Sequence, residues 1–189
     1  MKQMHKIILA SQSPRRKQLM EAAELKFEII IADVDETNPP GMDGALVPEY
    51  LAKKKAAAIQ SQVHDAIIIA ADTVVLLDDE ILGKPVDADN AKEILGKLSG
   101  RIHKVVTGVC MQKGAKQVSF STVTEVHFRT LTPEQIAHYV ERYKPYDKAG
   151  AYAIQEWIGM IGIEKINGDY YNVMGLPIGE VVLALKQFD

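Results

Sequence analysis

The sequence between Ala66 and Leu77 is apolar apart from Asp72 and Thr73. A bounded run of this length, rich in Ile and Val, predicts a buried strand. A carboxylate is costly to bury, so Asp72 is either held by hydrogen-bond donors in a structural role or kept for metal binding or proton transfer. We favour the functional interpretation, because open α/β sheets present their ligands where strands end.

Strand-like and helix-like segments alternate along the 189 residues, without internal repeats or low-complexity tracts. This alternation predicts an α/β fold with a mixed, twisted sheet flanked by helices, in two lobes around a central cleft. No linker marks a boundary, so we expect a single domain over residues 1–189. Strands are expected at 5–10, 27–32, 67–77, 102–112, 117–128 and 158–166, with a short strand ending at 83. Helices are expected at 14–25, 48–63, 88–98, 133–143 and 177–188.

Composition argues against several classes of protein. The net charge is -3, from 22 basic and 25 acidic residues, so no overall positive field favours duplex nucleic acid. No apolar stretch approaches the roughly 20 residues of a membrane span. The single cysteine, Cys110, lies in an apolar run, where a buried core thiol is expected, and it cannot form an intrachain disulfide. We therefore expect a cytoplasmic protein that does not act at a membrane.

The stretch Ser11–Arg16 has the form of an anion-binding helix start. It follows an apolar run and places Ser13 as a helix cap and Pro14 in the first turn. Unpaired N–H groups, the positive end of the helix dipole and the guanidiniums of Arg15 and Arg16 would together bind phosphate. The alternative is a solvated basic turn. Because cations are disfavoured at a helix N-terminus, the paired arginines favour the phosphate interpretation.

Three successive lysines occupy the helix expected at 48–63. On a helical wheel Lys55 lies inside the apolar stripe, whereas Lys53 and Lys54 lie outside it. An inward lysine either finds an anion or extends to water at the edge of the helix, and the sequence leaves both open. Lys84, in a rigid turn between glycine and proline, is open in the same way between a phosphate contact and an exposed turn lysine.

A second carboxylate candidate, Glu36, lies with Asp35 in the polar loop after the second expected strand. Loop carboxylates are usually just solvated. Paired with Asp72 in a cleft that holds the basic residues, however, Glu36 would bind Mg²⁺ or Mn²⁺ against a polyphosphate, because hard oxygen ligands suit these ions.

Seven short motifs are spread along the chain: Ser-x-Ser-Pro-Arg-Arg at 11–16, Leu-Ala-x-x-Lys-Ala at 51–56, Ala-Asp-Thr at 71–73, Gly-Lys-Pro at 83–85, Leu-Ser-Gly-Arg at 98–101, Lys-Ala-Gly-Ala-Tyr-x-Ile-Gln at 148–155 and Gly-Leu-Pro at 175–177. Together, and in this order, they resemble the motifs of the Maf family from about residue 6 to residue 187. The resemblance implies an α/β fold like that of inosine triphosphate pyrophosphatases, commonly in a homodimer. It also implies a nucleoside triphosphate pyrophosphatase, which cleaves between the α- and β-phosphates with a divalent cation and releases a nucleoside monophosphate and pyrophosphate.

The same resemblance implies roles for individual residues. Asp72 matches the proposed general base, which activates water for attack on phosphorus, and Glu36 matches an acidic residue associated with metal binding and activity. Both are implied metal ligands, and Lys55 joins them as a catalytic residue. Clustered cations and a metal are needed because a highly charged triphosphate repels hydroxide. The implied triphosphate-binding residues are Ser13, Arg15, Arg16, Lys55 and Lys84.

Base recognition is implied by Thr73 and by the segment 148–155, which resemble the branch that prefers dTTP and UTP. Gln155 offers an amide donor and acceptor to the edge of a pyrimidine, and Thr73 offers a hydroxyl, so modified pyrimidine triphosphates are also candidate substrates. One departure concerns the base pocket. Glu156 and Trp157 follow Gln155 where many relatives have glycine, and a bulkier, charged residue there could reshape the pocket.

Two functions without turnover stay open. A nucleotide-binding regulator of septum formation would use the same cations, but it would tolerate Asp72→Asn, which a pyrophosphatase would not. Binding to nucleic acid is the weaker alternative, because aromatic residues make up 6% of the chain and the basic residues are expected to converge on a cleft.

Overall fold

The computed structural model describes residues 5–188. Its strands are β1 (Ile7–Leu9), β2 (Glu28–Ile29), β3 (Ile67–Leu77), β4 (Glu80–Leu82), β5 (Ile102–Lys113), β6 (Lys116–Phe128) and β7 (Ile163–Asn167). They pair in the order β2-β1-β3-β5-β6-β7, with β4 paired to β3, and both parallel and antiparallel pairs occur. The predicted α/β fold with a mixed sheet flanked by helices is confirmed. The chain forms two compact units: the first takes in the residues up to Thr73, Thr107–Thr122 and those from Gly175 onward, and the second takes in Val74–Val106 and Val123–Met174. The single domain expected over residues 1–189 stays a prediction.

The first unit is built on three parallel strands. Strand β1 (Ile7–Leu9) lies between β2 (Glu28–Ile29) and β3 (Ile67–Leu77), and Ile7 is in register with Ile67. Strand β3 has the bounds that its apolar run predicts, and nearly all of its side chains are buried. Strand β2 is shorter than the predicted 27–32, because it forms the edge of the sheet and only two of its exposed residues pair with β1.

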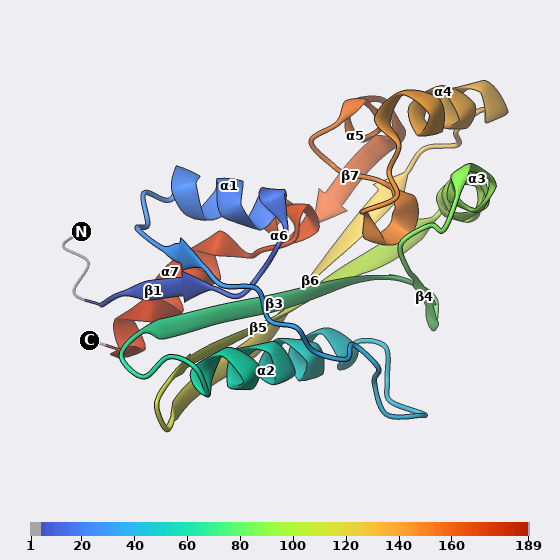
Figure 1. Ribbon diagram of the computed structural model, residues 1–189. Coiled ribbons are helices and arrows are strands. Elements are labelled where there is room, and N and C mark those ends of the chain that lie inside the picture. The colour runs from blue at the N-terminus through green and yellow to red at the C-terminus, as the bar shows by residue number, and fades with distance from the viewer. Residues whose placement is uncertain (1–4, 189) are drawn as a thin grey trace. The chain divides into compact units, whose positions relative to one another are not determined.

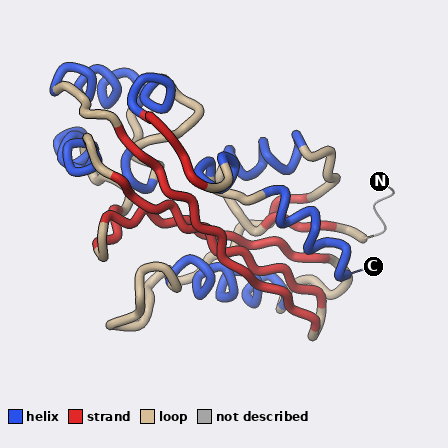
Figure 2. The backbone as a smooth tube through the Cα atoms, turned by 180° about the vertical axis from the view of Figure 1, so that it is seen from behind, coloured by secondary structure: helices blue, strands red, loops and turns tan. Residues whose placement is uncertain are grey.

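Helices cover both faces of these strands. Helix α2 (Val47–Gln60) packs Ala52, Ala56 and Ile59 into one core cluster with the even-numbered residues of β3, Ile68 and Ala70. Helices α1 (Pro14–Ala22) and α7 (Ile178–Leu185), the latter continued by a short 3-10 turn (Lys186–Phe188), lie on the opposite side of the strands from α2 (Figures 1 and 2). Because side chains alternate along a strand, Asp72 extends from the same face of β3 as Ile68 and Ala70, toward α2.

The start of α2 sits directly on strand β5 (Ile102–Lys113) at Gly108. A Cβ added to Gly108 would lie 2.1 Å from the backbone nitrogen of Glu49, so no larger residue fits without moving the helix. The Glu49 carboxylate also accepts hydrogen bonds from the hydroxyls of Ser119 and Ser121 on β6 (Lys116–Phe128). These contacts fix the position of α2. Cys110 lies in the cluster beneath this helix, which confirms the expected core thiol.

The second unit contains the remaining short elements. These are β4 (Glu80–Leu82), α3 (Ala88–Leu98), α4 (Pro133–Tyr143), a 3-10 turn (Ala149–Ala151), α5 (Trp157–Gly162), β7 (Ile163–Asn167) and α6 (Tyr170–Met174). Helix α3 has its predicted bounds, and α4 begins with the predicted capping box at Thr132 and Gln135.

One element of the second unit was predicted wrongly. The strand expected at 158–166 is helix α5 up to Gly162 and becomes strand β7 only at Ile163. The isoleucines of this stretch favour a strand, but a Cβ at Gly159 would lie 1.8 Å from the carbonyl oxygen of Ile154. Glycine there lets the chain turn closely enough for the Gly159 N–H to donate to the Glu156 carbonyl and begin a helix. Among residues 5–188, no helix is both long and apolar enough to cross a membrane.

Candidate active site

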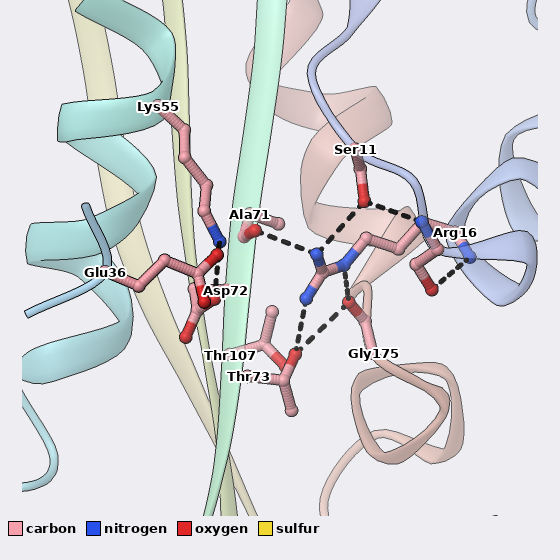
Figure 3. A network of polar contacts seen from close by, with 10 residues as sticks. Ser11, Arg16, Glu36, Lys55, Ala71, Asp72, Thr73, Thr107 and Gly175 are labelled. Carbon is pink, nitrogen blue, oxygen red and sulfur yellow. Dashed lines mark hydrogen bonds and ion pairs between the residues drawn. The ribbon is translucent and has the colours of Figure 1, made fainter. Parts of the chain in front are cut away.

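Lys55 joins the two carboxylates that the sequence singles out. Its ammonium lies 2.7 Å from Oε1 of Glu36 and 2.8 Å from Oδ1 of Asp72 (Figure 3). The residue is 8% exposed, so its predicted inward orientation is confirmed. A buried ammonium is tolerated only with such partners, and here one partner comes from the loop after β2 and the other from β3. The three groups form a charged cluster that carries one positive and two negative charges.

Asp72 lies just beyond the point where the parallel pairing of β1 and β3 ends, and not at the end of β3 itself. Strand β3 continues to Leu77, but its parallel pairing with β1 ends at Leu9 and Ile69, after which the Ala10 N–H donates to the Ile69 carbonyl. The Asp72 side chain retains 17% of its exposure, in contrast to the fully buried residues before it. Asp72 therefore follows the end of the parallel ladder, where α/β sheets present ligands, and its role in binding a ligand stays a prediction.

Arg16 binds both neighbours of Asp72. Its guanidinium donates to the Ala71 carbonyl over 2.8 Å and to the Thr73 hydroxyl over 3.0 Å. Two further bonds reach the Gly175 carbonyl at 2.8 Å and the Ser11 hydroxyl at 3.2 Å. These four bonds engage most of the five N–H donors of an arginine. Burial lowers the pKa of the Arg16 guanidinium, and the charge of Asp72 opposes that shift.

The two basic residues lie on opposite sides of β3. Figure 3 shows Lys55 reaching Asp72 from α2 and Arg16 reaching Thr73 from α1, with the strand between them. The bonds of Arg16 tie together the loop after β1, the middle of β3 and the loop before α7. Its predicted contact with phosphate stays a prediction.

The Thr73 hydroxyl belongs to the same network. Besides Arg16, it contacts the Thr107 hydroxyl at 2.9 Å and donates to the Gly175 carbonyl at 3.4 Å. Gly175 has a φ of +115°, which favours glycine. Sequence reasoning did not assign Thr107 a role, and it noted Ser11 and Gly175 only as members of motifs. Nothing local in the sequence indicates that they meet, because Gly175 and Arg16 are 159 residues apart.

The start of α1 has the predicted cap. The Ser13 hydroxyl accepts a hydrogen bond from the Arg16 N–H at 3.5 Å, and Pro14 is the first residue of the helix. The Ser13 N–H in turn donates to the Ser11 hydroxyl at 3.1 Å. Arg15 extends from the same first turn and is partly buried. This turn therefore presents a guanidinium beside the positive end of a helix, as an anion site requires.

Lys84 and Gln155 belong to the second unit. Lys84 is exposed in the turn after β4, and the carbonyl of its neighbour Gly83 accepts a hydrogen bond from the Gly150 N–H at 3.1 Å. Gln155 precedes α5, and its side-chain oxygen is buried without a hydrogen-bond partner among the described residues. Their predicted contacts with the substrate stay predictions.

The carboxylates of Asp72 and Glu36 are suitable ligands for a divalent cation, but two side chains are too few to hold the ion by themselves. Within residues 5–188, no group of three or more His, Cys, Asp or Glu side chains is placed to hold a metal ion. Mg²⁺ is commonly bound by one or two carboxylates together with water and the phosphates of a substrate. The pair therefore fits an ion that arrives with a polyphosphate better than one held by the protein alone.

Comparison with known proteins agrees with the fold and the motifs. The model of the family described as Maf-like protein matches residues 6–188. The dTTP/UTP pyrophosphatase of Phocaeicola vulgatus is 49% identical over 97% of this chain and 96% of its own length, and that of Cytophaga hutchinsonii is 49% identical over 96% and 83%. A solved structure of a HAM1 protein from Coxiella burnetii shares the fold, with a TM-score of 0.55 and 15% identity over 97% of this chain and 100% of that one. The chain belongs to the Maf family, and the resemblance of its motifs is confirmed.

Proposed function

We propose that this protein is a nucleoside triphosphate pyrophosphatase that hydrolyses dTTP and UTP, and modified pyrimidine triphosphates, to the monophosphate and pyrophosphate. Its membership of the Maf family and its likeness to relatives named dTTP/UTP pyrophosphatases support the reaction and the substrates. The observation that carries the proposal is the pairing of Asp72 with Lys55 at the end of the parallel strand pairing. This places a partly exposed carboxylate, held by an ammonium, where an α/β sheet presents ligands.

Asp72 acts as the general base in this proposal. It takes a proton from the attacking water while the water oxygen forms a bond to the α-phosphorus. The bond from the α-phosphorus to the oxygen that bridges the α- and β-phosphates breaks, and pyrophosphate leaves with that oxygen. Lys55 orients the carboxylate of Asp72 through their 2.8 Å contact and contributes positive charge near the phosphates.

Glu36 and Asp72 are the proposed ligands of Mg²⁺ or Mn²⁺. When bound, such an ion neutralises phosphate charge and stabilises the leaving pyrophosphate. Because the Lys55 ammonium contacts both carboxylates, it also keeps them close together without the ion. The side chain of Glu36 is 56% exposed on its loop, so it has room to adjust its oxygens.

The remaining site residues are proposed either on the geometry of the structure or on the family motif. Ser13 and Arg15 are proposed to hold the triphosphate at the start of α1, on the geometry of that turn. Arg16, Thr73, Lys84 and Gln155 are proposed substrate contacts on the family motif alone. For Arg16 and Thr73 the network described above adds a second task, which is to hold the strand that carries Asp72.

Asp72→Asn provides the direct test. Pyrophosphate release from dTTP, UTP, CTP and 7-methyl-GTP is measured with Mg²⁺ or Mn²⁺ for the wild type, Asp72→Asn and, as a matched control, the exposed Asp79→Asn. We expect selective hydrolysis of dTTP and UTP, lost by about 100-fold or more in Asp72→Asn and kept in the control. Tight binding of nucleotides with no turnover in the wild type would instead support the regulator of septum formation.

Location, oligomeric state and partners form the last part of the proposal. We place it in the cytoplasm as a homodimer that holds neither nucleic acid nor membrane, on the net charge of -3 and the family resemblance. Sedimentation at micromolar concentration, together with a filter-binding assay on oligonucleotides at low salt, tests the dimer and the lack of nucleic-acid binding.

A further inference from the structure

The segment from Lys148 to Glu156, here called the 148–156 loop, is closed by charged side chains at its two ends. The Lys148 ammonium lies 3.6 Å from Oε1 of Glu156 and 2.7 Å from Oδ1 of Asp147. The Lys148 side chain is 9% exposed and that of Glu156 is 23% exposed, so water screens their attraction less than at a surface. Gln155 lies inside this loop, next to one of the two charged ends.

Tyr139 of helix α4 holds the same loop at two points. Its hydroxyl donates to Oε2 of Glu156 and accepts a hydrogen bond from the Ala153 N–H at 3.2 Å. The side chain is fully buried, and its ring stacks on that of Tyr143 one turn further along the helix. Because the phenol donates a hydrogen bond to the carboxylate and accepts one from the backbone amide, it fixes the distance between those two groups. The residues on both sides of Ile154 and Gln155 are therefore anchored to α4.

The backbone adds a third restraint beyond Gln155. Glu156 is the residue before α5, and its carbonyl accepts hydrogen bonds from the N–H groups of Gly159 at 3.0 Å and Met160 at 3.3 Å. The missing Cβ of Gly159 lets the first turn of α5 lie against the Ile154 carbonyl. Gln155 thus occupies a position at which the main chain has little freedom to move.

The side-chain oxygen of Gln155 lacks a hydrogen-bond donor within residues 5–188. Its Oε1 atom is buried, and no described residue donates to it. A buried acceptor without a donor is unfavourable, and a ligand N–H that reaches it removes the cost. Uracil and thymine carry a hydrogen on N3, whereas N3 of cytosine is an acceptor and would face Oε1 with a lone pair. A fixed Gln155 therefore favours the first two bases over the third.

We propose that Glu156 is a positioning residue that sets the preference for uracil and thymine over cytosine. It acts by holding Gln155 through the ion pair with Lys148 and the hydrogen bond from Tyr139. This inference rests on the proposed function, since it takes Gln155 as the residue that reads the base. Position 156 directly follows the motif at 148–155, so Glu156 adds a restraint at the end of the base-reading loop.

The experiment compares the specificity of four forms of the full chain. Values of kcat/KM for dTTP, UTP and CTP are measured for the wild type, Glu156→Gln, Tyr139→Phe and the exposed control Glu164→Gln. Glu156→Gln removes the charge at constant size, and Tyr139→Phe removes both hydrogen bonds of the phenol. We expect the ratio of dTTP to CTP to fall about tenfold in both variants, through a higher KM for dTTP, with kcat and the control little changed.

Two outcomes would overturn the inference. One is an unchanged ratio in Glu156→Gln and Tyr139→Phe, and the other is an equal loss of activity on all three nucleotides, which a purely structural role predicts. Thermal unfolding of each variant shows that the measured forms are folded. Calorimetric binding of dTTP and CTP gives the same ratio without turnover. A wild type that binds but does not hydrolyse therefore contradicts the pyrophosphatase, whereas an unchanged affinity ratio contradicts the role of Glu156.

Discussion

The guanidinium of Arg16 donates to the hydroxyl of Thr73 over 3.0 Å, on the face of β3 that is turned away from Lys55. The same guanidinium binds the Ala71 carbonyl, so both neighbours of Asp72 are held from the side that Asp72 does not use. Asp72 itself meets Lys55 on the other side. Arg16 thus holds the strand in place, whereas Lys55 contacts the carboxylate of Asp72.

Replacing Thr73 with valine tests the anchor. Thr73→Val keeps the shape of the side chain but leaves Arg16, Thr107 and the Gly175 carbonyl without the hydroxyl between them. We expect the free energy of unfolding to fall by about 1–3 kcal/mol, measured by urea denaturation. Thr73→Ser retains the hydroxyl and should lose less. A Thr73→Val protein as stable as the wild type would show that the network contributes little.

Removal of the Lys55 ammonium tests the charged cluster. Lys55→Met keeps the length of the side chain but leaves Glu36 and Asp72 facing each other without the positive charge that joins them. We expect pyrophosphate release to fall by about 100-fold or more, because an oriented carboxylate and a phosphate-binding charge are lost together. Lys53→Met, on the exposed side of the same helix, is the control. Activity kept in Lys55→Met would exclude Lys55 from catalysis.

The metal requirement tests the part played by Glu36. Chelation of divalent cations should abolish turnover, and its return should follow added Mg²⁺ or Mn²⁺. In Glu36→Gln we expect the metal concentration for half-maximal activity to rise about tenfold, since one oxygen ligand loses its charge. Asp35→Asn, one residue earlier, keeps an oxygen that can accept from Thr37 and serves as the control. An equal response of both variants to metal would contradict the assignment.

The pH dependence of stability should depend on His103. Burial, with a smaller effect of His127, lowers the pKa of His103 to about 3, from 6.5 in the unfolded chain. Its ring makes edge-to-face contacts with those of Phe128 and Tyr152, and its Nε2 is 2.8 Å from the Tyr152 hydroxyl. Below pH 6.5 the unfolded chain binds the proton and the folded one does not, so stability falls as the pH falls toward 3.

We expect His103 alone to cost about 2 kcal/mol between pH 7 and pH 5. The measurement is urea denaturation across this range for the wild type and His103→Gln, in which an amide can still meet the Tyr152 hydroxyl. The slope should flatten in His103→Gln and stay in His138→Gln, which changes an exposed histidine of α4. Equal slopes in all three proteins would show that His103 titrates normally.

Local patterns predicted most of what lies near Asp72. The bounds of β3 follow from its apolar run, and the burial of Lys55 follows from its place on the helical wheel of α2. Both depend on residues close in sequence. The cap at Ser13 is equally local, because it joins residues three positions apart.

The partners of Arg16 could not be predicted in this way. Its bonds reach residues 55 and 159 positions away, which no local pattern in the sequence indicates. The expected contact of Arg16 with phosphate stays a prediction. Helix α5 was missed for a similar reason. The contact that permits it, between Gly159 and the Ile154 carbonyl, depends on the close return of the chain and not on side-chain periodicity.

Because side chains alternate between the two faces of β3, the length of this strand cannot change freely. A single codon lost before Asp72 within the strand would turn the carboxylate toward Arg16 and the Thr73 hydroxyl toward Lys55, so that anchor and reactive group exchange places. Loss of two codons would keep each group on its own face and shift it by one repeat of the pleat. Deletions of even length in this strand should therefore be less damaging than deletions of odd length, because only the even ones keep Asp72 on the face of Lys55. The exposed loop that bears Glu36 should tolerate changes of a single residue better than the strand does.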